Sequence, residues 1–83
     1  MVNTAPLYAG ADVGASRTKV ALLDASKNLV GHAVQKSGTD FTATARHCLA
    51  LALEMAGAPE SAVARAVSTG YGRHNVDFAR DAR

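Results

Sequence analysis

The sequence has 83 residues and a formal net charge of +2, the size of one small domain or part of a larger one, and only 5% is aromatic, so its core is thin. The charges are scattered and no aromatic residues interleave with Lys or Arg, which argues against nucleic-acid binding. A single cysteine excludes an internal disulfide, no apolar run approaches the ~20 residues of a membrane span, and the start has no basic, apolar leader, so we expect a cytoplasmic protein without a membrane partner.

Three strands are predicted first. Residues 7–13 and 18–24 are apolar runs separated by a turn at 14–17, and residues 29–36 form a third, more polar run that we expect at a sheet edge. The second run is apolar on both faces, which predicts that it is covered on both sides. The short connections predict an antiparallel meander, with Asn28 suited to a positive φ in the second turn.

An amphipathic helix is predicted next. Thr39 or Asp40 can serve as its N-cap, and Gly57, with Pro59 two residues later, is a natural end. The apolar positions recur at steps of three and four and form one stripe. This stripe consists of Phe41, Ala45, Cys48, Leu49, Ala52, Met55 and Ala56.

A fourth strand completes the pattern. Residues 59–62 predict one short helical turn, residues 63–68 a strand, and residues 74–83 the start of another helix. Because the fourth strand follows a helix, it can return parallel to the first strand by a crossover. The predicted fold class is therefore α/β, with a three-stranded antiparallel meander, a helix, and a fourth strand parallel to the first.

Two glycine-bearing loops follow the first and fourth strands. Asp12 and Gly14 lie where the first strand ends, and Gly70 and Gly72 lie where the fourth ends. If these strands are parallel neighbours, both loops lie at one edge of the sheet, which is where ligands bind in open α/β sheets.

The first loop has the residue types of a site for phosphate and magnesium. Gly14 lets backbone N–H groups approach a phosphate, and Ser16 and Thr18 add hydroxyl donors. Asp12 suits a hydrated Mg²⁺, and Lys19 or Arg17 could neutralise phosphate charge. A plain hairpin turn with a solvated Asp12 fits the same residues, so both interpretations stay open. The spacing fits neither a Walker A loop nor the GxGxxG of a dinucleotide fold.

The second loop, TGYGR, places Arg73 after two glycines, and its planar guanidinium suits a phosphate or a carboxylate. An ordinary loop with a half-exposed Tyr71 is the alternative. Cys48 lies on the helix stripe and is predicted to be a core residue. None of the three histidines has a visible partner, so the sequence supports no acid–base pair.

The stretch GADVGASRTKVALLD resembles the first phosphate motif of the actin–Hsp70–sugar kinase superfamily, in which a β-hairpin binds the phosphates. Together with STGYGR after one helix, it is similar to the ATPase family that contains the activators of 2-hydroxyacyl-CoA dehydratases and the ATP-binding subunits of benzoyl-CoA reductase. Members typically open GIDVGSTTTK…LLD and carry TGYGR after a later strand. The resemblance covers about residues 9–79 and implies part of an RNase H-like, actin-like ATPase lobe.

What this resemblance implies is ATP hydrolysis that drives low-potential electron transfer to a CoA-ester dehydratase or reductase. Family members are homodimers that share one 4Fe–4S cluster, or subunits of a hetero-oligomeric reductase. Carried over by residue, the resemblance makes Asp12 a catalytic residue and the acid associated with the metal, which holds Mg²⁺ through water. It also implies a set of ATP-binding residues, namely Gly14, Ser16, Thr18, Lys19, Gly70 and Gly72.

The sequence departs from the family pattern at three positions. Ala11 stands where Ile is usual, Ala15 replaces a usual Ser or Thr, and Arg17 replaces a usual Thr. The cluster cysteines, the second phosphate motif and the adenosine-binding glycines of the family lie further along, so the cluster ligands are absent here.

We therefore expect residues 1–83 to be the N-terminal part of an actin-like ATPase lobe, without the second lobe that closes on the nucleotide. Such a half-site should bind ATP weakly and hydrolyse it poorly by itself. Two alternatives stay open at this point: a fragment of a sugar-kinase-like phosphotransferase, and a non-catalytic interaction module.

Overall fold

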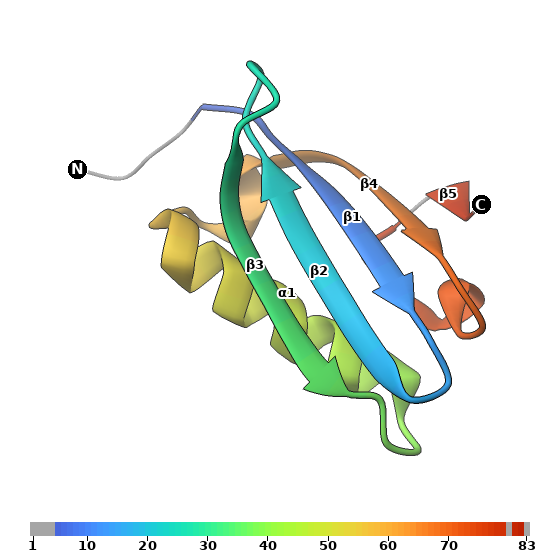
Figure 1. The fold of residues 1–83 in the computed structure, drawn as a ribbon. Helices are drawn as coiled ribbons and strands as arrows, with labels where there is room; N and C mark the ends of the chain where they lie inside the picture. Colours follow the sequence, from blue (N-terminus) through green and yellow to red (C-terminus); the bar gives the residue numbers. More distant parts are fainter. Residues whose placement is uncertain (1–4, 80, 83) are drawn as a thin grey trace.

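The computed structural model describes residues 5–79 and 81–82, and in that part a five-stranded mixed sheet carries one α-helix on one face (Figure 1). The strand order is β3-β2-β1-β4-β5. The elements are β1 (Leu7–Val13), β2 (Arg17–Leu23), β3 (Leu29–Lys36), α1 (Phe41–Ala56), the 3₁₀ turn η1 (Glu60–Ala62), β4 (Val63–Thr69), the 3₁₀ turn η2 (Arg73–Asn75) and β5 (Asp81–Ala82).

The predicted topology is confirmed. β1, β2 and β3 form an antiparallel meander, and β3 is the edge strand that its polarity predicts. β4 returns from α1 and pairs in parallel with β1, with Asp12 opposite Thr69 at the last pair of the ladder. The carboxyl ends of β1 and β4 therefore meet at one edge of the sheet, the lower right of Figure 1.

Two local predictions are wrong. Residues 74–83 do not begin a helix within the described residues: η2 is a single turn, and β5 adds two residues beside β4, with Val67 opposite Asp81. In the second turn Lys27, with φ 68°, takes the left-handed backbone instead of Asn28. The Asp24 carboxylate accepts the N–H groups of Ser26 and Asn28, and this holds Asn28 in place as a donor.

Helix α1 begins and ends at the predicted caps. The Asp40 carboxylate accepts the N–H of Ala43 at 3.0 Å, and Gly57 ends the helix with φ 67°. Met55, however, is 58% exposed, whereas Leu53 is buried. The buried stripe advances by about 3.6 residues per turn through Cys48 and Ala52, so a residue three positions further lies on its flank.

The core lies between α1 and one face of the sheet. Helix α1 packs on β2 and β3, and the buried apolar side chains of this layer are Leu7, Ala9, Ala11, Val13, Val20, Leu22, Ala45, Cys48, Leu49, Ala52 and Leu53. The opposite face, here called the open face, carries the alternate residues of the same strands. These include Tyr8, Gly10, Asp12, Arg17, Lys19, Leu23, His32 and Val34.

The expected burial of the second strand on both sides is not seen in this chain. Leu22 is fully buried under α1, but Leu23, its neighbour on the open face, is 36% exposed. Tyr8, Leu29 and Val34 are also exposed large apolar residues. No helix in the part of the chain that the structure describes is long and apolar enough to cross a membrane.

Gly31→Ala should destabilise the fold, because a β-carbon at Gly31 would meet the carbonyl oxygen of Ala52 in α1 and lie 3.1 Å from its carbonyl carbon. The helix must move away from β3, and overpacking of this kind costs about 1–3 kcal/mol. The matched control is Gly10→Ala on the open face, where a β-carbon has no neighbour within 4 Å. Urea unfolding should show a clear loss of stability for Gly31→Ala only; equal midpoints for the two variants would contradict this packing.

Candidate functional site

The ends of β1 and β4 form a compact rim. Gly70, directly after β4, has φ 96°, and a β-carbon there would lie 2.6 Å from the carbonyl oxygen of Val13 and 2.8 Å from Oδ1 of Asp12. The position therefore requires glycine for its backbone angle and also for the space beside Asp12. The two glycine loops converge on one edge of the sheet, as the sequence predicts.

A main-chain hydrogen bond joins the second loop to β1. The Gly72 N–H donates to the carbonyl oxygen of Val13 at 2.8 Å. A β-carbon at Gly72 would lie 2.6 Å from Cγ1 of Val13 and 3.0 Å from the Phe41 ring, so glycine is needed for close approach. Because its N–H is already used, Gly72 shapes the loop and has no main-chain donor left for a ligand.

Arg73 stabilises the second loop by hydrogen bonds within the loop. The backbone N–H and Nη1 of Arg73 both donate to the carbonyl oxygen of Gly70, at 3.2 and 3.1 Å. The buried Ser68 hydroxyl donates to the carbonyl oxygen of Arg73 at 2.7 Å. In this arrangement the guanidinium predicted to meet an anion binds its own loop, and Tyr71, 75% exposed, makes an edge contact with Phe41.

A second set of contacts joins the segment after the loop to α1. Arg46 on α1 binds the Asp77 carboxylate through Nε at 2.8 Å and the Glu60 carboxylate through Nη1 at 2.7 Å. Its guanidinium also lies 5.8 Å from the centre of the Phe78 ring. These contacts hold the segment that follows the second loop against α1. Sequence reasoning missed them because Arg46 is far in the chain from Glu60 and from the Asp77–Phe78 pair.

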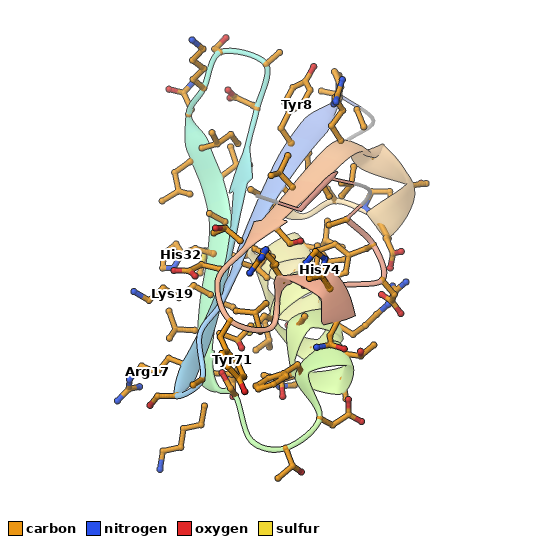
Figure 2. All side chains as sticks on the ribbon, turned by 90° about the vertical axis from the view of Figure 1, so that its right-hand side faces the viewer. Tyr8, Arg17, Lys19, His32, Tyr71 and His74 are labelled. Carbon is orange, nitrogen blue, oxygen red and sulfur yellow. The ribbon has the colours of Figure 1, made fainter. Side chains whose placement is uncertain are left out.

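Asp12 and Lys19 face one another across the β1–β2 hairpin on the open face. Lys19, Arg17 and His32 project from the same side of the sheet, away from α1 (Figure 2). Because side chains alternate along a strand, Thr18 lies on the other side, under α1. The structure thus brings together Asp12, Lys19 and Gly70 at the rim, with Gly14 and Ser16 in the adjoining turn.

Thr18 does not fit its predicted role as a hydroxyl donor to a phosphate. Its side chain is fully buried, and its hydroxyl is 2.8 Å from the hydroxyl of Ser37, which is also fully buried. The alternation of the strand is the reason, since Val20 and Leu22 are buried on the same face. Thr18 supports the hairpin from inside.

The rim offers main-chain N–H groups. Within the described residues, no hydrogen bond uses the N–H of Ala15, Ser16, Gly70 or Tyr71, and Ala15, Ser16 and Tyr71 are exposed. Meanwhile the carbonyl groups of Val13, Gly14, Ser16 and Arg17 all accept hydrogen bonds. Unpaired N–H groups beside a turn form a concavity that favours an anion. Neither Ala15 nor Tyr71 carries a side-chain signal that would reveal this in the sequence.

A hollow of about 470 Å³ lies over the open face and reaches the rim. Its lining is mainly apolar, but it includes Asp12, Lys19, His32 and Thr69. The hollow therefore connects the acid of the rim with the open face of the sheet.

The described residues contain no group of three or more His, Cys, Asp or Glu side chains placed to hold a metal ion. Cys48 is fully buried, and burial raises the pKa of its thiol. A hydrated Mg²⁺ needs only one or two carboxylates, so Asp12 alone remains compatible with it.

Gly70→Ala should disturb both the backbone and the carboxylate of the rim. Gly38→Ala is the matched control, because Gly38 also has a positive φ, 64°, but a β-carbon added there would have no neighbour within 4 Å. We expect Gly38→Ala to cost about 1 kcal/mol of stability and Gly70→Ala at least about 2 kcal/mol, because strain and overlap add. Thermal unfolding measures the difference; equal losses would show that the contact of Gly70 with Asp12 is not tight.

The Cys48 thiol should react slowly with iodoacetamide in the native protein at pH 8, because burial both blocks access and keeps the thiol protonated. In urea the same thiol should react at the rate of a free cysteine. Mass spectrometry of the alkylated protein gives both rates, and fast labelling without denaturant would contradict the core position of Cys48.

No protein-family model matches the sequence, and the comparison with curated proteins gives no match. Two solved structures are similar to the chain. One is the crystal structure of the (R)-2-hydroxyglutaryl-CoA dehydratase component A of Acidaminococcus fermentans, with TM-score 0.82 and 28% identity, covering 95% of this chain and 30% of that one. The other is the activator of the 2-hydroxyisocaproyl-CoA dehydratase from Clostridium difficile with bound ADPNP, with TM-score 0.81 and 26% identity, covering 93% of this chain and 28% of that one.

The chain thus spans about 30% of the length of these two proteins. Over nearly all of its own length it has their fold, and its sequence identity to them is above a quarter. The resemblance to the activators of 2-hydroxyacyl-CoA dehydratases that the two glycine loops predict is therefore confirmed.

Proposed function

We propose that this chain supplies the phosphate-binding part of the ATP site in an activator of a CoA-ester dehydratase. In the whole protein, ATP hydrolysis would drive electron transfer to the dehydratase, or to a reductase such as benzoyl-CoA reductase. Two structurally similar proteins support this proposal: one is a component of a CoA-ester dehydratase, and the other is an activator of such a dehydratase that holds the ATP analogue ADPNP.

One observation carries the proposal: Gly70 packs against the Asp12 carboxylate at the common end of β1 and β4. This contact places the acid of the first loop against the second loop, and within the described residues no hydrogen bond uses the N–H of Ala15, Ser16, Gly70 or Tyr71. Backbone N–H groups suit phosphate oxygens, and a carboxylate suits the waters of a hydrated Mg²⁺. The same edge therefore presents complementary groups to both parts of a magnesium–nucleotide.

The residues at the rim fit this ligand. Asp12 would hold Mg²⁺ through water, and the N–H groups of Ala15, Ser16 and Gly70 would bind phosphate oxygens. Lys19, opposite Asp12 on the open face, would balance the phosphate charge. Magnesium, when bound, neutralises phosphate charge and thereby lowers the barrier to attack on the terminal phosphate.

A 4Fe–4S cluster does not fit the residues of this chain. Such clusters are held by four cysteine thiolates, and the sequence has one cysteine, which is buried in the core. Even two copies of the chain would bring only two cysteines. Electron transfer in a cluster-containing dimer is therefore proposed for the whole protein only, as are its dehydratase partner and its cytoplasmic location.

Asp12→Asn tests the proposal. We expect the wild-type chain to bind ADPNP weakly and more tightly with Mg²⁺ than without, and Asp12→Asn to lose that difference and to bind at least about tenfold less tightly. Asp24→Asn is the control, because it removes the same charge at the β2–β3 turn, the other end of the sheet. Isothermal titration with and without Mg²⁺ measures all three.

Two results would count against the proposal. If the wild-type chain does not bind ADPNP at millimolar concentration, the nucleotide site fails and a non-catalytic module becomes the better interpretation. If Asp12→Asn binds with the same Mg²⁺ dependence as the wild type, the acid at the rim has no part in the site.

A further inference from the structure

Ser37, between β3 and α1, lies against the turn that joins β1 to β2. Its hydroxyl donates to the carbonyl oxygen of Gly14 at 2.6 Å, and its backbone N–H donates to the carbonyl oxygen of Ser16 at 2.9 Å. Ser37 is fully buried. One residue therefore fixes two of the peptide groups in the first loop.

The direction of the buried hydroxyl pair follows from this contact. The Ser37 hydroxyl has one proton, and that proton is used on Gly14. In the 2.8 Å contact between the two hydroxyls, Thr18 must therefore be the donor and Ser37 the acceptor. The Thr44 hydroxyl donates to the carbonyl oxygen of Ser37 at 2.8 Å, which places Ser37 at the centre of a small polar network under the hairpin.

Because of the geometry of the peptide bond, this network also determines the direction of an N–H group in the turn. In a trans peptide the C=O of one residue and the N–H of the next point in opposite directions. Since the Gly14 carbonyl points at Ser37, the N–H of Ala15 points away from it. Ser37 lies with Thr18 on the helix side of the hairpin, so the Ala15 N–H is directed toward the side that carries Asp12 and Lys19.

We infer that Ser37 is a positioning residue of the phosphate loop: its hydroxyl holds the Gly14 carbonyl inward, so that the Ala15 N–H faces a nucleotide phosphate. This inference rests on the proposed function. Ala15 has no side-chain hydroxyl, and it contacts the phosphate through its main-chain N–H. Without Ser37 the peptide can rotate, and a carbonyl oxygen can take the position of the donor.

Ser37→Ala tests the inference, with two companion variants. Ser37→Thr keeps the hydroxyl but adds a methyl group at a buried position, and Thr44→Val removes a hydroxyl of the same network without removing either donor of Ser37. ADPNP binding with Mg²⁺ is measured by titration, stability by urea unfolding, and the order of the Ala15 and Ser16 amides by ¹⁵N relaxation in the protein without nucleotide.

We expect Ser37→Ala to bind ADPNP about tenfold less tightly, and the order parameter of its Ala15 amide to fall from about 0.85 toward 0.6, because the variant loses the hydroxyl bonded to the Gly14 carbonyl. Ser37→Thr should be less stable but bind like the wild type, and Thr44→Val should lose stability without losing affinity. A purely structural role would make affinity follow stability in all three variants, and that result would overturn the inference.

The inference and the proposed function fail differently. If the wild type binds ADPNP and Ser37→Ala binds equally tightly, Ser37 does not position the loop, while the nucleotide site stands. If the wild type does not bind, the proposed function fails and the phosphate role of Ser37 falls with it.

Discussion

The parallel pairing of β1 with β4 is the contact on which the site depends. It aligns two carboxyl ends that are separated by two strands and a helix in the chain, and the Gly72 N–H extends the contact one step beyond the ladder to Val13. Gly70 can lie against Asp12 because it has no side chain and because glycine adopts the positive φ that the chain requires there. If that pairing shifted by one residue, Asp12 would turn to the other face of the sheet.

The rim relies on main-chain groups more than on side chains. Ser37 satisfies two carbonyl groups of the first loop, those of Gly14 and Ser16, from the helix side, and N–H groups remain on the other side. This arrangement explains how the loop can lack the hydroxyl usual at Ala15. Arg73 and Arg46 have structural roles, because both guanidinium groups bind within the chain and hold the second loop and the segment after it in place.

Much of the fold could be predicted from the sequence because its signals are local. Apolar runs of strand length, the Asp40 cap and the Gly57 stop define the elements, and short connections define the meander. The buried position of Thr18 also follows from the strand pattern, since it shares a face with Val20 and Leu22, although both the residue types of the loop and the family resemblance place its hydroxyl on the phosphate side. The Ser37 network could not be predicted, because it depends on how closely β3 returns to the first turn.

Under the proposed function, the amides of two separate loops form one anion site. The most direct measurement is a ¹H–¹⁵N spectrum of the chain titrated with ADPNP and Mg²⁺. We expect the largest shifts to occur together, at one ligand concentration, for the amides of Ala15, Ser16, Gly70 and Tyr71, while the amides of the β2–β3 turn stay unchanged. Shifts confined to one loop, or spread over the open face without these amides, would contradict it.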